Sequence, residues 1–494
     1  MRGIDKLFRR LRPTSADEAT AATRVEDGFA KAVPQVSRYI VTWAQNATPV
    51  NGAFLRALET YAAYWDAHII VVPGRYRNPT SVFEYEDEEG DLHWDTRVLP
   101  YMMDGRVLLA RGLTVHGDIK IQPTAKRPLS GFEVYGKTSS IFGHPKIQLR
   151  CVPTDTRIPR IFTSTGAVTV PNYTDSRAGK TGEGHHCYGA VVVEVDAARD
   201  LFHLRHVHGL DDGSFTDLDL RYDDAGVYPA EPAAALVCGD VHVAKSEPSV
   251  LDATLYAEDS LFACVQPEHV VYHDVHDHDS RNHHSRSDPF QRYARVRGWQ
   301  GDSVEEELTA SSDFLDRTPG SAQVVVVASN HHDAVTRWLR EVDPRTDVAN
   351  ARIFHELWLR ALQEVELSGR APDGFRMFYE MRGRTRARFL ERNEPFSLHG
   401  VSLQYHGDRG LGGARPGLNT YAYLSTKTIT GHRHSPSIMD GNTTVGVTGA
   451  LDQGYNDLPC AHVHAHCVLY ADGKSTLIHV WETPDRAVWR LPPK

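Results

Sequence analysis

The sequence predicts an α/β fold. Short apolar runs typical of buried strands recur along the chain and alternate with segments in which apolar residues have helical spacing. In the second half of the chain, three such runs are followed closely by Asp, His or Asn. Because parallel strands end at the same edge of a sheet, where α/β folds bind their ligands, we expect these polar residues to converge on one site.

The chain is long enough for two domains. Its 494 residues exceed the usual size of a single hydrophobic core. We expect a basic arm at residues 1–30, an α/β domain of unknown role at 31–230, and a second α/β domain at 231–494 that carries the polar residues. The Pro-Ala-Glu-Pro segment at 229–232 serves as the linker in this scheme.

The first domain begins with a β-α-β pattern. Residues 38–43 are strand-like, residues 54–61 have helical spacing, and residues 68–72 form a buried strand that Pro73-Gly74 ends. Further strands are predicted at 107–109, 119–121 and 190–195. No motif in this domain indicates a catalytic function. Its pair His185-His186 either reaches the active site or serves only the packing of the domain.

The second domain repeats the alternation of strand and helix. Apolar runs predict strands at residues 235–237, 270–272, 324–328, 400–404 and 467–470. Helical spacing predicts helices at residues 303–315, 334–342 and 351–367.

The composition of the chain limits the kinds of protein that it can be. The net charge of −10 argues against a broad basic DNA-binding face, although it does not exclude a nuclease, because metal ions bring their own positive charge to a phosphate. The six cysteines are scattered without a Cys-x-x-Cys motif, which fits a reducing cytoplasm. No stretch of 18 apolar residues occurs, so we expect no membrane span.

Four short islands of metal-ligand residues occur in a fixed order. They are Cys238-Gly239-Asp240-Val241-His242, His273-Asp274-Val275-His276-Asp277, Ser329-Asn330-His331-His332-Asp333 and Gly431-His432-Arg433-His434. His406 lies alone between the last two, and we prefer it to His399 because it follows an alternating apolar run and opens a Gly-rich loop. One such motif alone usually reflects turn chemistry, but the ordered set indicates a metal site. Oxygen and nitrogen donors without thiolate suit Mn²⁺, Fe or Zn²⁺.

In this order the islands resemble the calcineurin-like metallophosphoesterase superfamily. Its pattern is Asp-x-His, Gly-Asp-x-x-Asp/Asn, Gly-Asn-His-Asp/Glu, a single His and Gly-His-x-His. The resemblance covers roughly residues 234–435 and implies a four-layer αββα sandwich for the second domain. Two islands depart from the pattern: His273 and Ser329 replace glycine, and His332 precedes Asp333. The second departure leaves open which group orients His331.

Further stretches resemble the pre-early DNA-degrading, DNA-transfer proteins of T-five-type bacteriophages, from about residue 38 onwards. These stretches are residues 169–174 with His185-His186, residues 273–277 with Asn282-His283-His284, and residues 406–410 with 412–415.

The resemblance implies two divalent cations, with Mn²⁺ preferred and Zn²⁺, Fe or Mg²⁺ as alternatives. Asp274 would bridge them. The first cation would also bind Asp240, His242 and His434, and the second Asn330, His406 and His432.

Other residues are candidates for catalysis and substrate binding. His331 is adjacent to a ligand and is the candidate general acid, with Asp277 and Asp333 beside it as further catalytic candidates. Asp277 and His284 also suit a role in fixing ligand orientation. Arg409 and Arg415 lie in the Gly-rich loop and suit phosphate binding, as does His284, although such a loop can also be a plain surface turn.

Two further patterns have open interpretations. Residues 381–388 concentrate arginine, which either contacts nucleic acid or forms a solvated or intersubunit face. His462, His464 and His466 alternate, as on one face of a strand, and form either a polar face or a metal strip.

The resemblance implies a two-metal DNase that degrades host DNA early in infection, in the cytoplasm of a bacterial host. DNA would be its substrate, with a second copy or a second phage protein as further partner. Two alternatives stay open. One is another metallophosphoesterase, such as a cyclic-nucleotide phosphodiesterase, a nucleotidase or a phosphatase. The other is a non-catalytic binding or assembly protein.

Overall fold

The computed structural model describes most of the chain. It covers residues 25–26, 29–30, 37–75, 93–133, 136–154, 158–282, 288–290, 293, 302–417, 420–454, 456 and 459–492. Most of the expected basic arm at residues 1–30 and the candidate residue His284 lie outside the described residues.

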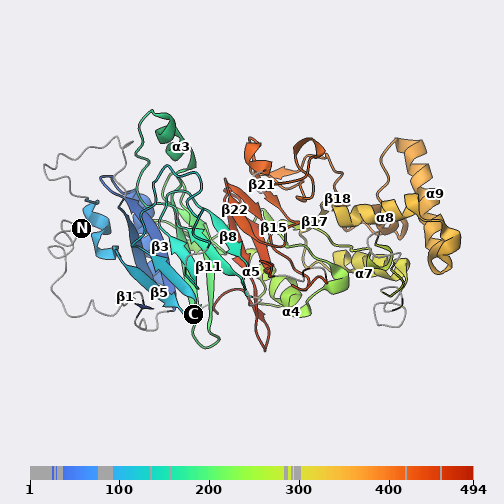
Figure 1. Ribbon diagram of the computed structural model, residues 1–494, viewed down its shortest axis with the longest axis horizontal. Coiled ribbons are helices and arrows are strands. Elements are labelled where there is room, and N and C mark those ends of the chain that lie inside the picture. The colour runs from blue at the N-terminus through green and yellow to red at the C-terminus, as the bar shows by residue number, and fades with distance from the viewer. Residues whose placement is uncertain are drawn as a thin grey trace.

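The α/β class is confirmed, and a six-stranded mixed sheet forms its centre (Figure 1). Its order is β18 (Ala387–Phe389), β17 (Gln323–Val326), β16 (His269–Tyr272), β15 (Ala235–Val237), β24 (Ala465–Leu469) and β25 (Ser475–His479). Strands β15 to β18 are parallel neighbours, whereas β24 and β25 join antiparallel. The carboxyl ends of three sequence-predicted strands therefore reach the same edge.

A four-stranded sheet lies beside the six-stranded sheet. Its order is β11 (Leu201–His208), β10 (Gly189–Asp196), β3 (Arg38–Gln45) and β4 (His68–Gly74). The hydroxyl of Thr476 in β25 donates a hydrogen bond of 3.0 Å to the carbonyl of His206 in β11. The edge strands of the two sheets are thus in contact.

The third main sheet has ten strands and combines both halves of the chain. Its order is β19 (Ser397–Leu398), β20 (Val401–Ser402), β21 (Lys427–Thr430), β23 (Asn442–Thr444), β22 (Ser437–Met439), β8 (Leu149–Val152), β9 (Arg160–Ser164), β7 (Ser139–Phe142), β6 (Leu113–His116) and β5 (Arg106–Ala110). The halves join where Ser437 and Ile438 pair with Arg150 and Leu149. This sheet crosses the boundary expected between residues 230 and 231.

The strand residues alternate between two cores. Leu236, Val270 and Val324 pack into a core shared with the helices. Val237, Val271 and Val325 point the other way, into a core shared with the four- and ten-stranded sheets. Side chains on both faces of these strands are buried, which is why the strands read as continuous apolar runs.

Helices cover the outer faces of the first two sheets. Those packed on the six-stranded sheet are α4 (Pro248–Leu251), α5 (Leu261–Val265), α7 (Val304–Asp316), α8 (Asn330–Glu341), α9 (Ala351–Ser368) and α10 (Gly374–Met381). Helix α2 (Gly52–Trp65) packs on the four-stranded sheet. Figure 1 shows α7, α8 and α9 gathered at the end of the molecule opposite the N-terminal strands.

The remaining elements are short. They are β1 (Val25–Glu26), β2 (Phe29–Ala30), β12 (Phe215–Asp217), β13 (Leu220–Tyr222), β14 (Val227–Pro229), β26 (Trp481–Glu482), β27 (Ala487–Val488), α3 (Arg177–His185), the π-helical turn η4 (Asp252–Tyr256) and the 3₁₀ turns η2 (Thr96–Tyr101), η3 (Val243–Lys245), η5 (Asp279–Arg281), η6 (Pro344–Thr346), η7 (Val348–Asn350), η8 (Leu411–Gly413) and η9 (Thr420–Tyr423).

One expected strand is wrong and another is shorter than expected. Residues 119–121 form no strand, and Ile119 and Ile121 pack instead against a small cluster that includes Phe142 and Phe162. Pro123 follows closely, and proline restricts the preceding residue and donates no ladder hydrogen bond. The strand expected at 400–404 is reduced to Val401–Ser402.

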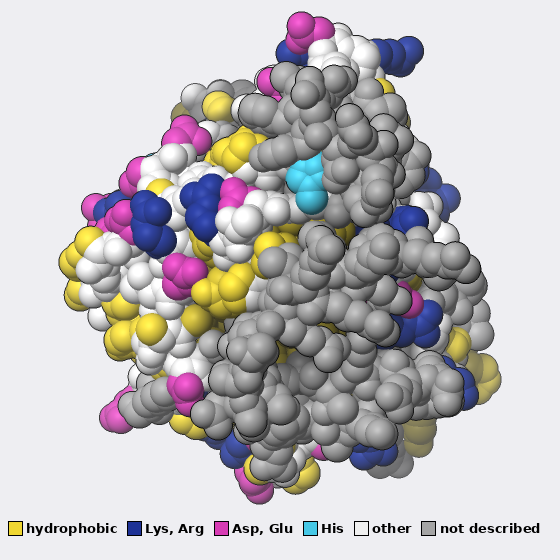
Figure 2. All heavy atoms as spheres, turned by 90° about the vertical axis from the view of Figure 1, so that its left-hand side faces the viewer, with side chains coloured by type: hydrophobic (Ala, Val, Ile, Leu, Met, Phe, Trp, Pro, Cys, Tyr) yellow, Lys and Arg dark blue, Asp and Glu magenta, His cyan; other side chains and the backbone are white. Residues whose placement is uncertain are grey.

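Charges are mixed on the face shown in Figure 2, which is the left-hand end of Figure 1. Among its described residues, basic and acidic side chains are interspersed with apolar ones. The described residues of this face therefore form no broad basic area. None of the described helices is both long and apolar enough to cross a bilayer.

Candidate metal centre

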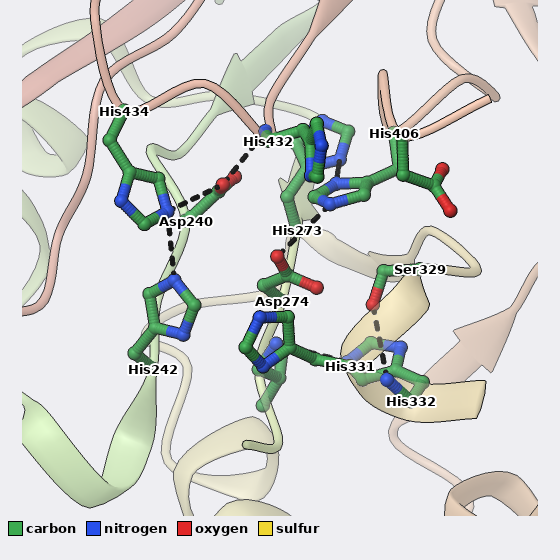
Figure 3. Close-up of polar contacts among 12 residues, drawn as sticks. Asp240, His242, His273, Asp274, Ser329, His331, His332, His406, His432 and His434 are labelled. Carbon is green, nitrogen blue, oxygen red and sulfur yellow. Dashed lines mark hydrogen bonds and ion pairs between the residues drawn. The ribbon is translucent and has the colours of Figure 1, made fainter. Parts of the chain in front are cut away.

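The predicted ligands converge where the ends of the six- and ten-stranded sheets meet (Figure 3). Asp240 and His242 follow β15, Asp274 follows β16, His406 follows β20, and the His432–His434 loop follows β21. Backbone hydrogen bonds tie these loops together. The amide of His242 donates to the carbonyl of Asp274 at 2.8 Å, and the amide of Gly431 donates to the carbonyl of His406 at 2.7 Å.

Asp240, His242 and His434 form the first group of ligand atoms, all buried. His434 Nε2 lies 3.0 Å from His242 Nε2 and 3.1 Å from Asp240 Oδ2. One imidazole proton cannot serve both contacts. Ligand atoms bound at about 2.0–2.2 Å to a common cation lie roughly 3 Å apart, so this spacing fits a cation.

Asp274, His406 and His432 form the second group. His406 Nε2 lies 3.0 Å from Asp274 Oδ2, and both side chains are buried, whereas His432 is only partly buried. The groups are adjacent, because the amide of His432 donates a hydrogen bond of 2.7 Å to Asp240 Oδ2 of the first group. Six of the seven predicted ligands thus gather in two neighbouring groups.

Each group contains a carboxylate oxygen without a hydrogen-bond donor among the described residues. These oxygens are Oδ1 of Asp240 and Oδ1 of Asp274, and both are buried. Leaving such an acceptor unpaired is costly in a protein interior. A divalent cation at each group would satisfy it, so the residues fit the metal that the resemblance implies.

The backbone is strained at the ligands. His242, Asp274, His432 and His434 all have positive φ angles, of 49°, 42°, 74° and 55°. Such angles are unfavourable for residues with a side chain and cluster at functional sites. Gly431 is also required, because a Cβ at this position would lie 2.2 Å from Asp240 Oδ1.

Contacts between histidines and buried carboxylates shift pKa values at the site. Burial raises the pKa of Asp240, but the hydrogen bond from His434 and the charge of His406 outweigh it and lower that pKa to about 2. Burial lowers the pKa of His406, but Asp274 outweighs it and raises that pKa. A histidine must lose its proton from the nitrogen that binds a cation, so we expect metal affinity to fall at low pH.

Asp277 holds two histidines of the site. Its Oδ1 lies 2.5 Å from His242 Nδ1 and 3.3 Å from His331 Nδ1. Burial lowers the pKa of His331, but the charge of Asp274 and the hydrogen bond and charge of Asp277 raise it to about 10. Asp277 is therefore the group that orients His331, the point that the sequence left open.

Helix α8 begins at the edge of the site. The side chain of Ser329 caps it by accepting a hydrogen bond of 3.3 Å from the amide of His332. Asn330, the remaining predicted ligand, is the first residue of α8 and is exposed, and His331 follows with a partly buried side chain. The positive end of the helix thus lies where an anionic substrate would approach.

Asp333 belongs to an ion-pair network at the rim. Its Oδ2 accepts hydrogen bonds of 2.8 Å from Arg392 and from Arg409. Arg392 also donates to Asp408 at 2.7 Å. This network links the predicted residues Asp333 and Arg409 through Arg392 to Asp408, which lies two residues after His406 in the sequence. Arg415 lies farther along the same loop and is exposed.

The arginine run at 381–388 and the pair His185-His186 make contacts within the fold. Arginines of the 381–388 run pair with acids of α7: Arg382 with Glu305, and Arg384 with Asp313 and Asp316. His185 and His186 hydrogen-bond to the carbonyls of Pro123 and Thr169 within the first half of the chain.

His462, His464 and His466 are likewise held by local contacts. His464 and His466 hydrogen-bond to Val447 and Thr254. His462 hydrogen-bonds to Leu451, and its ring meets that of His434 edge-on at 4.9 Å.

Sequence reasoning missed two residues of the site. His273 Nδ1 lies 3.4 Å from His406 Nδ1, where it can fix the orientation of that ligand, and its position within a predicted island was the available signal. Arg392 had no signal, because its role depends on the fold of two distant loops.

Comparison with known proteins gives one informative relative. A scan against models of protein families found no match. "Protein A1" of Escherichia phage T5 is 32% identical over 467 residues, which cover 90% of this chain and 82% of that protein.

Proposed function

The chain belongs to the family of protein A1 of Escherichia phage T5, and from this premise we propose that it is a metal-dependent phosphodiesterase of the metallophosphoesterase type that hydrolyses DNA. The observation that carries the proposal is the pair of adjacent ligand groups, which include six of the seven ligands in the order of that superfamily. Both groups also contain a buried carboxylate oxygen without a hydrogen-bond donor among the described residues, as a site for a cation would.

Two divalent cations, when bound, would neutralise the phosphate and supply an activated water as nucleophile. Asp240, His242 and His434 would hold the first, and Asp274, His406 and His432 the second, with Asn330 at the open side. Manganese is the preferred metal, because the sequence resemblance implies it and none of the proposed ligands is a thiolate. The nearest thiol in sequence, Cys238, is buried in the apolar core.

His331 is the proposed proton donor to the leaving oxygen. Its ring is held by Asp277 and remains partly accessible, with 24% of its side chain exposed. In the metal-free protein, Asp274 and Asp277 raise its pKa to about 10, and the contact with Asp277 favours the protonated form that an acid requires. The amino end of α8 and the guanidinium of Arg409 would attract the phosphate from the same side.

The surroundings favour a polymeric substrate over a small one. The loop from Gly407 to Leu424 links two ligand segments, and its Arg409, Arg415 and Tyr423 are exposed. Arginines bind a phosphate backbone, and an exposed tyrosine can stack on a base. Degradation of host DNA in the bacterial cytoplasm, which the sequence resemblance implies, is the biological role we propose.

A cleavage assay tests the proposal. Wild type, Asp274→Asn and a surface control, Asp485→Asn, would be incubated with linear and circular duplex DNA, single-stranded DNA and bis-p-nitrophenyl phosphate, with Mn²⁺, Mg²⁺, Zn²⁺ or EDTA. We expect Mn²⁺-dependent DNA breakdown by wild type and the control, and none with EDTA or Asp274→Asn.

The outcomes separate the alternatives. Cleavage of the small ester alone would indicate another metallophosphoesterase, and DNA as substrate would be rejected. No cleavage of any substrate, with the protein folded and loaded with metal, would favour a non-catalytic binding protein.

A further inference from the structure

A third group of ligand atoms lies outside the two groups described above. It consists of His276 and His278, which flank Asp277 in the loop after β16, and Glu307 of α7. One ligand atom of each residue lies within 4.8 Å of those of the other two. Both histidines are buried, and Glu307 is partly buried.

The hydrogen bonds of His276 determine where its lone pair points. The hydroxyl of Ser311 donates to the carbonyl of Glu307 at 3.1 Å. That hydroxyl must therefore accept from His276 Nδ1, which lies 3.1 Å away. Nδ1 then carries the proton, and Nε2 has a free lone pair. Metal-binding histidines are oriented in this way, with the other nitrogen donating to a neighbour.

The lone pair of His276 is directed at a second imidazole. His276 Nε2 lies 3.4 Å from His278 Nδ1. Two atoms that bind one cation tetrahedrally at about 2.0–2.1 Å are separated by about 3.4 Å. The observed spacing equals that of two ligands of one cation.

Glu307 is held as a ligand carboxylate would be. It accepts hydrogen bonds from the amides of Asp279 and Ser280, at 2.5 and 3.1 Å, and from the Ser280 hydroxyl at 2.6 Å. Three of its four lone-pair positions are thus filled, which leaves one on Oε1. These bonds fix the carboxylate against the loop that carries both histidines.

The local charge also favours a cation. Asp277, Asp279 and Glu307 lie close together. Lys245 contacts Asp279 at 2.8 Å, and His242 and His331 contact Asp277, whereas Glu307 forms no ion pair with a described residue. A divalent ion would balance the remaining negative charge.

We propose that His276, His278 and Glu307 bind a third divalent cation, of the Zn²⁺ type by its two imidazoles and one carboxylate. Its role is structural. It joins α7 to the loop on which Asp277 lies, and so fixes the carboxylate that orients His242 and His331. This site does not depend on the proposed DNase activity.

Metal counting tests the proposal. Chelator-treated protein would be loaded with Zn²⁺, freed of excess metal by gel filtration, and analysed for bound metal per chain. We expect Glu307→Gln and His276→Gln to bind one equivalent less than wild type. Glu306→Gln, an exposed neighbour on α7, should bind the same amount. Thermal unfolding in EDTA checks that the variants are folded.

A variant with a disabled main centre distinguishes metal bound at this site from metal bound at the main centre. In the Asp240→Asn/Asp274→Asn double variant we expect one equivalent to remain, and adding Glu307→Gln should remove it. Co²⁺ bound to the double variant should give a visible absorption spectrum of four-coordinate type. Equal metal content in wild type and Glu307→Gln would overturn the proposal, and so would no bound metal in the double variant.

Discussion

One oxygen of Asp277 lies at hydrogen-bonding distance from two histidines with different roles. His242 belongs to the first ligand group, whereas His331 lies at the open side of the site. Both contacts use Nδ1, so the Nε2 atom of each ring points away from Asp277. A single buried carboxylate therefore sets the geometry of a ligand and of the candidate proton donor.

Replacing Asp277 with Asn should weaken both metal binding and catalysis. Outer partners of metal-bound histidines typically contribute roughly 10–100-fold in affinity or activity. We expect a loss in that range for Asp277→Asn, measured by Mn²⁺ titration and by DNA cleavage. The matched control is Asp217→Asn, which removes a buried ion pair with Arg205 far from the site. The control should lower the Tm but retain Mn²⁺ affinity. Equal Mn²⁺ affinities for the two variants would argue against the role of Asp277.

The protonation of His331 should make the stability of the metal-free protein depend on pH. Its pKa is raised from 6.5 to about 10, so the protonated form stabilises the fold. That stabilisation is complete below about pH 6.5 and is lost as the pH rises through about 10.

Thermal unfolding in EDTA from pH 6 to 10.5 measures this effect. The Tm advantage of wild type over His331→Gln should shrink as the pH rises. His355→Gln, at an exposed position on α9, controls for loss of a histidine and should follow wild type. A pH-independent difference between wild type and His331→Gln would contradict this account.

At the residue scale, the sequence predicted which candidate ligands gather better than it predicted the residues around them. The expected side chains gather in two groups because a short motif directly after a strand lies at the edge of the sheet. They are Asp240, His242, Asp274, His406, His432 and His434. The partners of these residues were not predictable. Asp277 was a candidate without an assigned contact, and Arg392 depends on two distant loops.

At the scale of elements, the first turn of α8 links stability to the site. Ser329 caps the helix, and Asn330 and His331 are its first two residues. Because β17 is parallel to β15 and β16, this turn lies at the same edge of the sheet as the loops that follow those two strands. The position of His331 therefore depends on how the helix begins.

Removing the cap should affect both stability and function. Ser329→Ala should lower the free energy of unfolding by about 1 kcal/mol, as is typical of a lost N-cap. It should also reduce the rate of DNA cleavage, because His331 is then less firmly held. Ser176→Ala removes the equivalent cap of α3, whose side chain accepts from the amide of Gly179 at 3.1 Å. The control should lose similar stability in urea unfolding without loss of activity. Unchanged activity in Ser329→Ala would contradict the link.

Most elements could be predicted because their apolar patterns are local. The runs at β15, β16 and β17 are buried on both faces, so no alternation was needed to recognise them. Residues 119–121 show the limit, since a short alternating segment packs equally well as an irregular loop against Phe142 and Phe162.

At the scale of the whole molecule, the two halves share one sheet and one core. Strand β22 pairs with β8, and the paired residues Ser437 and Arg150 lie 287 residues apart in the sequence. The core between the sheets contains Val41 and Val191 from the first half and Val237 and Val325 from the second. The boundary expected near residue 230 rests on the Pro-Ala-Glu-Pro segment, and the strand pairing across it leaves no local signal in the sequence.

The second half should therefore not fold well alone. We expect residues 231–494, expressed without the first half, to aggregate or to lack a cooperative unfolding transition, because β22 would have an open edge and part of the core would be uncovered. Co-expression with residues 1–230 should restore a soluble complex. A cooperative transition of the isolated fragment at the Tm of the full chain would show that the halves are independent.

The central claim is that three of the sequence islands and His406 form one centre for two cations. Anomalous diffraction at the manganese edge, from crystals of the Mn²⁺-loaded protein, tests it most directly. We predict one peak at Asp240, His242 and His434 and another at Asp274, His406 and His432. No peak at either group, in crystals that contain manganese elsewhere, would contradict the account.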